Sequence, residues 1–358
     1  MSSKQYMAIS RQTARNALNG SPAYQFYKIK GKLEPEPDFK EDIINEWSGQ
    51  DLAQGGTEHV RTSTAWKFPW ESRIFPSVEL ATLLEFLFGY AASPATVDTT
   101  ATKVMFKTLT DMFDDSSAAL DKALALLPHT DKGGTTYCQR FLGGRIKDGE
   151  ISFKGGEDAD LKLNFIGGPW ISAPEQTEVA GMSFPASRRF KSGNLLCYLG
   201  SGATLTGTAP DYTDIAPGTM PAFKPDDLTL KIEPNIDDTF KLNGYDGPSV
   251  TERKGSWKIT ADFTIDFSDP ASGWSSYDAW AARFADIQYA PLMLKLDSGE
   301  LAGSTTQTRQ LLIYCPKMKI SNAAPDRKND GSKTKVKFTL ESLVDVSINV
   351  AAVAKLVY

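Results

Sequence analysis

The chain has 358 residues, enough for two domains of ordinary size, and its 41% hydrophobic and 23% charged residues are typical of a folded globular protein. With 39 lysines and arginines against 44 aspartates and glutamates, the net charge of −5 disfavours a protein that holds DNA by its phosphates. Only two histidines occur, His59 and His129, too few for a multi-histidine metal centre. No apolar run approaches the roughly 18 residues of a membrane span, and residues 1–6 lack the apolar core of a signal peptide. We therefore expect synthesis in a cytoplasm and no membrane partner.

A first β-rich unit is predicted over residues 24–167, after an N-terminal arm at 1–23. Its strands are indicated by period-two alternation of apolar and polar residues, or by short β-prone runs between glycines and prolines. These strands are expected at 24–29, 62–70, 135–141, 150–153 and 161–165. The glycine pairs at 143–144 and 155–156 are interpreted as turns, so the strands are antiparallel with one buried face.

Two helices are predicted within this unit. Ser77 fits a helix N-cap and Gly89 a C-terminal stop. Five apolar side chains between them follow helical spacing and share one face: Leu80, Leu83, Leu84, Leu87 and Phe88. A second helix is expected over 116–127, where Pro128 ends it.

The same order of elements predicts a second unit over 223–350, followed by a C-terminal tail at 351–358. Alternation or apolar runs indicate its strands, which are expected at 228–232, 257–267, 292–296, 311–315 and 336–350, the last as one long strand or two in register. A helix is expected over 276–286, and a polar hairpin loop over 326–331. Because Trp66 matches Trp257 and Tyr137-Cys138 matches Tyr314-Cys315 in this order, we interpret the chain as a duplication. The predicted fold is mainly β with a few helices: two tandem antiparallel β-sandwich or barrel-forming units, each with a packed α-helix.

The connection between the units, 168–222, is rich in glycine, proline, serine and threonine. Its one apolar run, at 195–199, is consistent with a lone strand. The connection is far longer than joining two units requires, and long irregular connections are usually functional or disordered. We therefore expect it and the terminal segments to make contacts between chains rather than within one unit, with a floppy linker as the alternative.

No catalytic, cofactor-binding or metal-binding residue is predicted. The adjacent carboxylates at 41–42 are interpreted as solvated surface, those at 114–115 as a helix start and those at 237–238 as part of a turn. Cys138 and Cys315 lie in predicted strands, where a small buried hydrophobic role is the simpler interpretation. The glycine pairs lack the following helix that a phosphate site needs. These observations predict no enzyme and no cofactor.

The arrangement resembles the tail tube proteins of long-tailed (siphovirus-type) bacteriophages, with a duplicated tube domain. The resemblance covers about residues 24–350 and rests on 66–89, 141–156 and 161–167, where a glycine-flanked hairpin precedes a long strand. It implies a major tail protein of the virion, assembled in the host cytoplasm into rings whose inner wall is a continuous β-barrel. The rings stack with one another and with other tail proteins, and DNA passes through the lumen without specific binding. A doubled member implies a ring of three chains with pseudo-sixfold symmetry, with a hexamer as the alternative.

Two other function classes remain open from the residues alone. The first is a glycan-binding β-sandwich, such as an adhesion or baseplate module. The second is a β-sandwich enzyme such as a glycosidase, disfavoured because no catalytic constellation is visible.

Overall fold

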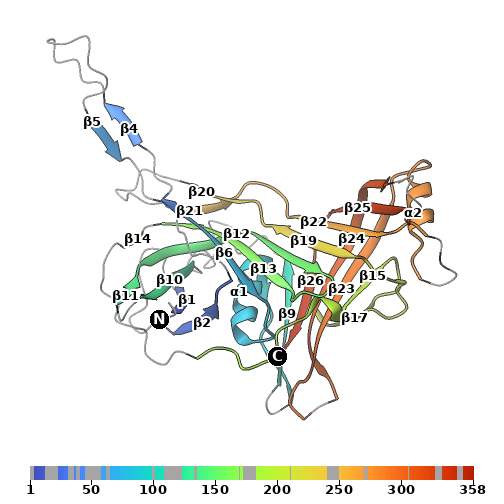
Figure 1. The fold of residues 1–358 in the computed structure, drawn as a ribbon, viewed down its shortest axis with the longest axis horizontal. Coiled ribbons are helices and arrows are strands. Elements are labelled where there is room, and N and C mark those ends of the chain that lie inside the picture. The colour runs from blue at the N-terminus through green and yellow to red at the C-terminus, as the bar shows by residue number, and fades with distance from the viewer. Residues whose placement is uncertain are drawn as a thin grey trace, which may run out of the picture.

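A computed structural model provides the structure, and its fold is mainly β, with a large antiparallel sheet system (Figure 1). Within the described part of the chain, 63% of the residues are in strands and two segments form α-helices. The residues that the structure describes are 4–12, 23–30, 36–37, 41–44, 58–61, 65–98, 101–108, 123–132, 135–168, 170–171, 183–209, 211–239, 250–268, 270, 273–304, 306–326, 333–344 and 350–358. Among them, no helix has the length and apolar character needed to cross a bilayer.

The N-terminal half of the chain carries fourteen of the described strands and the longer helix. In chain order these are β1 (Lys4–Gln12), β2 (Tyr24–Lys28), β3 (Glu36–Pro37), β4 (Glu41–Ile44), β5 (Glu58–Arg61), β6 (Trp66–Arg73), α1 (Val78–Phe88), β7 (Gly89–Ala91), β8 (Ala95–Asp98), β9 (Ala101–Thr108), β10 (Ala123–Lys132), β11 (Thr135–Cys138), β12 (Arg140–Lys154), β13 (Asp160–Gly167) and β14 (Trp170–Ile171). The β4–β5 hairpin projects from the body in Figure 1.

The C-terminal half carries the remaining described strands, a short 3-10 helix and the second α-helix. These are η3 (Ser192–Asn194), β15 (Leu195–Leu199), β16 (Thr204–Thr208), β17 (Asp211–Ala216), β18 (Ala222–Phe223), β19 (Asp227–Glu233), β20 (Ile236–Thr239), β21 (Val250–Arg253), β22 (Lys258–Asp266), α2 (Ser276–Ala282), β23 (Tyr289–Leu301), β24 (Thr308–Asp326), β25 (Lys335–Ser342) and β26 (Val353–Val357).

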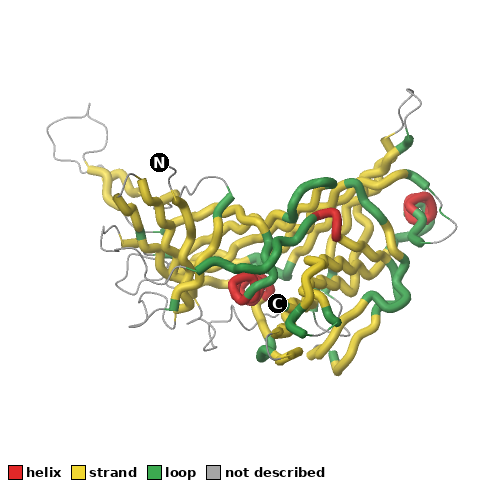
Figure 2. The backbone as a smooth tube through the Cα atoms, turned by 60° about the horizontal axis from the view of Figure 1, so that its bottom comes forward, coloured by secondary structure: helices red, strands yellow, loops and turns green. Residues whose placement is uncertain are grey.

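One run of antiparallel strands crosses both halves of the molecule, in the order β6–β13–β12–β19–β22–β25–β24. The two halves meet where β12 pairs with β19, from Gly149 opposite Ile232 to Lys154 opposite Asp227. In Figure 2, strands extend from one end of the molecule to the other. We call this seven-stranded run the shared sheet.

The order of strand pairing recurs in the two halves. The pairings β1–β10–β12–β13–β6 of the first half correspond to β15–β23–β24–β25–β22 of the second. A two-stranded hairpin precedes β6 and another precedes β22, namely β4–β5 and β20–β21. In the first half, the final strand β14 pairs with the start of the long strand β12. In the second half, the final strand β26 pairs with the start of the long strand β24.

The register of the two long strands supports the same correspondence. The pairing of β12 with β13 shifts between Ile146 and Asp148, and that of β24 with β25 shifts between Ile320 and Asn322. Such bulges insert an extra residue at a definite place in a strand, so they serve as markers of position. Superposing the two bulges aligns Gly149 with Ala323.

The same alignment corrects the two landmarks chosen from the sequence. When the bulge alignment is extended through the strand pairings, Trp66 corresponds to Ile259 rather than to Trp257. Cys315 corresponds to Phe141 rather than to Cys138. The order of elements is therefore repeated, although the paired landmark residues were wrong.

Helix α1 forms as its sequence predicts. The Ser77 side chain accepts a hydrogen bond from the backbone N–H of Leu80, and Gly89 ends the helix with φ of 89°, which glycine adopts without strain. The helix lies almost wholly buried against β12, where a Cβ on Gly149 would approach the Leu87 side chain to 2.9 Å. The absence of a side chain at Gly149 therefore lets α1 pack directly on the long strand.

The helix predicted over 116–127 is wrong where the structure describes it. Residues 123–127 belong to β10, which runs through Pro128 and pairs with β1 and β12. All five side chains are fully buried, because β10 is covered on both faces and does not alternate. Leucines at positions 124 and 127 fit helical spacing by coincidence. Residues 116–122 lie outside the described part.

Two predicted strand ends also differ in the structure. The glycine pair at 143–144 lies inside β12 and makes no turn, although Gly143 has φ of 68°. The pair at 155–156 does turn, with Gly156 at φ of 81°. Near the other terminus, β25 stops at Ser342, so the strand predicted to continue to 350 ends earlier. The loop at 327–331 lies outside the described residues.

The segments predicted as an arm, a connection and a tail contain strands of the same sheet system. β1 pairs with β2 and β10, and β26 is buried between β24 and β9. The run at 195–199 is a strand as predicted, but it pairs with β18 and β23 rather than standing alone. The expectation was that these segments contact other chains rather than one unit of their own. Its second part is wrong for the described residues, which pair within the sheet system of their own chain.

Candidate functional site

The described residues with suspected chemistry lie apart from one another. His129 is buried in β10, not at a helix end, and its ring stacks on Tyr6 with centroids 4.2 Å apart. Asp237 and Asp238 lie in β20 rather than in a turn. Glu41–Asp42 and His59 lie in β4 and β5, where only the backbone is described, and 114–115 fall outside the described residues. Within the described part, no three side chains of His, Cys, Asp or Glu gather as metal ligands do.

Two cysteines are buried thiols without nucleophilic character. Cys315 lies inside β24, where burial raises the pKa of its thiol to about 12. Burial also raises the pKa of the Cys197 thiol in β15. Since the thiolate is the reactive form, both groups stay protonated and inert near neutral pH. Only the backbone of Cys138 is described, in β11.

The outer face of the shared sheet is an extended polar surface. Along β19, β22 and β25, every second residue is buried and its neighbours are at least partly exposed. The strand register lines the outward residues up in rows that cross both halves. One such row, which we call the central row, comprises Glu71, Lys162, Glu150, Lys231, Thr260, Glu341 and Lys319.

The central row alternates acid and base, apart from the neutral Thr260. The Lys162 and Glu150 side chains approach to 3.5 Å across the β12–β13 pair. The hydrogen bond that the Lys231 ammonium donates to Glu233 raises the pKa of Lys231, as do the charges of Asp148 and Glu150. Exposed pairs of this kind each contribute about 0–1 kcal/mol, so their main effect is on the surface potential rather than on stability. Because neighbouring charges cancel, the row offers no continuous basic track for a phosphate backbone.

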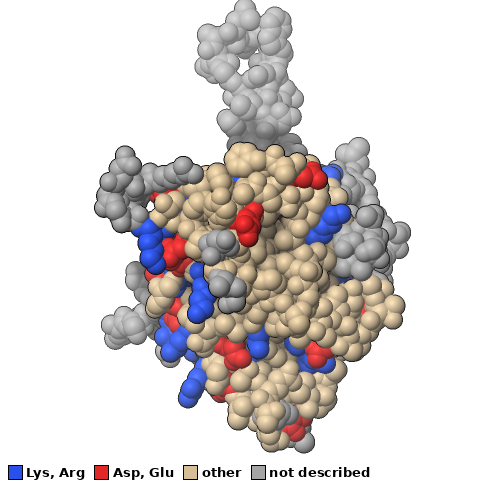
Figure 3. Space-filling model, turned by 90° about the vertical axis from the view of Figure 1, so that its right-hand side faces the viewer, with Lys and Arg blue, Asp and Glu red and all other residues tan. Residues whose placement is uncertain are grey.

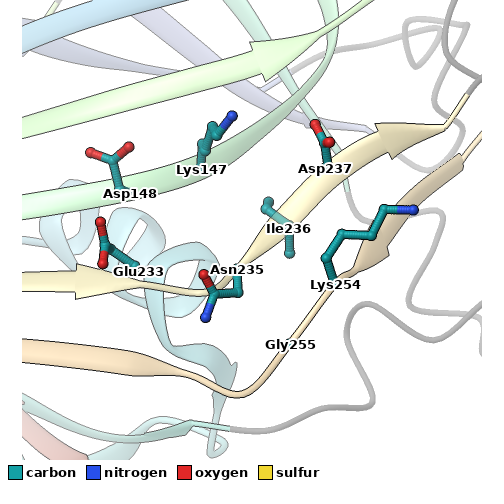
Figure 4. Close-up of a pocket in the computed structure, with 8 residues that line it drawn as sticks. All are labelled: Lys147, Asp148, Glu233, Asn235, Ile236, Asp237, Lys254 and Gly255. Atoms are coloured by element: carbon teal, nitrogen blue, oxygen red, sulfur yellow. The ribbon is translucent and has the colours of Figure 1, made fainter.

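A shallow open depression marks the join of the two halves at one end of this face. It is lined by Lys147, Asp148, Glu233, Asn235, Ile236, Asp237, Lys254 and Gly255. In Figure 4 the carboxylates of Asp148 and Glu233 lie next to each other on β12 and β19, while Lys254 extends from the β20–β21 hairpin. The depression lies where β12 and β19 meet the β20–β21 hairpin, so it is a feature of the seam between the halves.

The central row could not be found from the sequence by motif. Its members come from seven strands spread over residues 66–342, and no local pattern tells which of these strands are neighbours. The only signal was the period-two alternation, which placed each residue on an outward face without showing its neighbours.

Comparison with known proteins adds nothing to this picture, since no family model and no curated protein matches the chain.

Proposed function

We propose that the chain is a non-catalytic structural protein of a virion, built from two tandem β-sandwich units, that assembles into stacked rings. The rings form a bacteriophage tail tube through which DNA passes into the host. Three chains make a ring with pseudo-sixfold symmetry, with six chains as the alternative. Assembly takes place in the host cytoplasm, and other tail proteins contact the tube.

One observation carries this proposal: the two halves stand side by side in one sheet through the β12–β19 pair. The two halves have the same order of strands, so the strand pairing that joins them within one chain can be repeated between the second half of one chain and the first half of the next. Repeating it through a closed circle leaves no sheet edge exposed, which is the physical advantage of a ring.

The outer face of the shared sheet fits the wall of a DNA conduit. Its charges alternate in sign along the central row, and the whole chain carries a net charge of −5. A wall without a continuous stripe of lysine and arginine does not hold the DNA phosphates, so DNA can slide along it. We expect this face to line the lumen and to carry no excess of lysine and arginine.

Electron microscopy and native mass measurement of the purified chain test the proposal together. Rings or tubes are expected, with a ring mass of three chains. Discrete monomeric particles at every concentration tried would contradict it and would favour the glycan-binding module instead. In that case a glycan array and a turnover assay distinguish a binding module from a glycosidase.

A further inference from the structure

Four large apolar side chains are exposed in and just after helix α2. Tyr277 is 46% exposed, Phe284 78%, Ile287 55% and Tyr289 48%. We call these four residues the α2 end surface. Figure 3 views this end of the molecule face on and shows a broad uncharged area through its centre, with charged groups gathered mainly toward one side. Single exposed apolar residues are ordinary, but several within one short stretch of chain at one end of the molecule indicate an interaction surface.

This surface adjoins the free edge of the shared sheet. The Arg283 guanidinium donates a hydrogen bond of 2.7 Å to the backbone carbonyl of Ala323 in β24, which holds the end of α2 against that strand. Among the described residues, 322–325 of β24 pair with strand β25 on one side and with no described strand on the other. Helix and strand edge therefore form one continuous surface at the end of the molecule, where Figure 1 places α2.

The join inside the chain shows what this edge resembles. By the alignment of the two bulges, 323–325 of β24 correspond to 149–151 of β12. In β12 these residues are covered by β19, with Gly149 opposite Ile232 and Glu150 opposite Lys231. The open edge of β24 thus corresponds to the edge of β12 that pairs with β19 in the first half.

The helices show the same difference. Helix α1 is covered by the strands inserted after it, because β7 and β9 pack on it and β9 also pairs with β26 of the second half. No such insertion follows α2, which ends at Ala282 and leads to β23 at Tyr289. In consequence α1 is buried while the α2 end surface is open.

The opposite end of the chain carries the matching element. β3 pairs with β6 through Glu36–Lys67 and Pro37–Trp66, as β19 pairs with β22 through Lys231–Thr260 and Ile232–Ile259. The bulge alignment equates Trp66 with Ile259, so Pro37 takes the place of Ile232 and Glu36 that of Lys231. β3 is therefore the first-half counterpart of the strand that closes the internal join.

We propose that the α2 end surface and the β24 edge receive the first half of a second copy of this chain, with Ala324 opposite Glu36 of that copy. The contact rests on the proposed function and identifies the partner of its open edge. It repeats the geometry of β12 and β19, but with fewer backbone hydrogen bonds, because Pro325 and Pro37 lack the N–H group. The apolar side chains of the α2 end surface therefore supply most of the contact.

Cross-linking tests the register directly. The variant E36C/A324C is oxidised under assembling conditions, with E36C and A324C alone as controls for the natural cysteines. Covalent dimers and longer chains are expected only from the double variant. The matched control is E150C/K231C, the same pair of positions in the internal join, which should give an internal disulfide within one chain.

Substitution of the apolar side chains tests the surface. The variant F284S/I287S should need at least a tenfold higher concentration to assemble, while keeping the thermal midpoint of the monomer because both residues are exposed. Leu301→Ser is the control, since Leu301 is 56% exposed on the far end of β23.

The outcomes separate the two proposals. If rings form, the double-cysteine variant stays uncross-linked and F284S/I287S assembles normally, the inference is wrong while the tube function stands. If the unaltered chain never assembles, both are overturned.

Discussion

Arg283 and Ala323 join the second helix to the last long strand, through a hydrogen bond of 2.7 Å from the guanidinium Nη1 to the backbone carbonyl. Replacing the arginine by methionine keeps the aliphatic stem but removes the donor. We expect a loss of about 1 kcal/mol in the free energy of unfolding, typical of one hydrogen bond. Peptides covering 276–289 should exchange their amide hydrogens faster.

Lys333→Met is the control for this change, because Lys333 is highly exposed and its ion pair with Asp266 lies at the surface. Equal exchange in both variants would mean that the Arg283 bond does not hold the helix.

Gly167 leaves room for the Trp66 indole in the first half. A Cβ at Gly167 would lie 2.7 Å from both the Trp66 ring and the carbonyl oxygen of Gly143. Because one of these neighbours is backbone, Gly167→Ala should lower the free energy of unfolding by about 1–3 kcal/mol. Chemical denaturation measures the change. Gly193→Ala is the matched control, since a Cβ there meets nothing within 4 Å, and an equal loss in both variants would refute the packing account.

Asp214 fastens the β16–β17 hairpin to the body of the second half. Its carboxylate lies 2.6 Å from the Lys355 ammonium and 3.8 Å from that of Lys103. Burial acts to raise the pKa of Asp214, but the hydrogen bond and charge of Lys355, with that of Lys103, lower it overall. A carboxyl whose folded pKa is lowered stabilises the fold above its unfolded pKa, and this contribution is lost as the pH falls through the folded value.

We therefore expect the hairpin to loosen below about pH 4, where an ordinary aspartate protonates. Hydrogen exchange of 204–216 between pH 7 and pH 3 measures this loosening. In Asp214→Asn the hairpin should already be loose at pH 7 and should lose most of its pH dependence. Asp226→Asn, which alters an exposed pair with Lys335, is the control and should retain the acid response.

We expect the acids of the central row to keep the outer face from binding DNA. In the variant E71Q/E150Q/E341Q the lysines of that row lose their neighbouring carboxylates. We expect DNA binding at least roughly tenfold tighter than that of the unaltered chain, and weaker again as salt rises. Fluorescence anisotropy with duplex DNA measures both effects.

The control for the acidic row is E157Q/D211N/D226N, which removes the same charge from exposed acids outside the row and outside the α2 end surface. If this control binds DNA as tightly as E71Q/E150Q/E341Q does, the net charge of the chain, rather than the charge pattern of the outer face, determines the affinity for DNA. If the unaltered chain itself binds DNA tightly, the face cannot serve as the wall of a conduit.

The periodic strands and the first helix were determined by the sequence itself. The alternation at 257–267 and 228–232 appears in the structure as β22 and β19 with alternate residues buried. Ser77 and Gly89 set the ends of α1 as predicted. These features depend on neighbours a few residues away, so the local pattern carries the information.

Only the tertiary structure decided which strands are neighbours and which edges are left open. The residues at 123–127 form a strand because β1 and β12 lie on either side of them, and burial on both faces erases the alternation that would have identified it. The central row and the correspondence of Gly149 with Ala323 likewise arise from pairing between distant segments. Such pairing is set by the burial of whole faces and edges, a property of the assembled sheet that no single stretch of sequence contains.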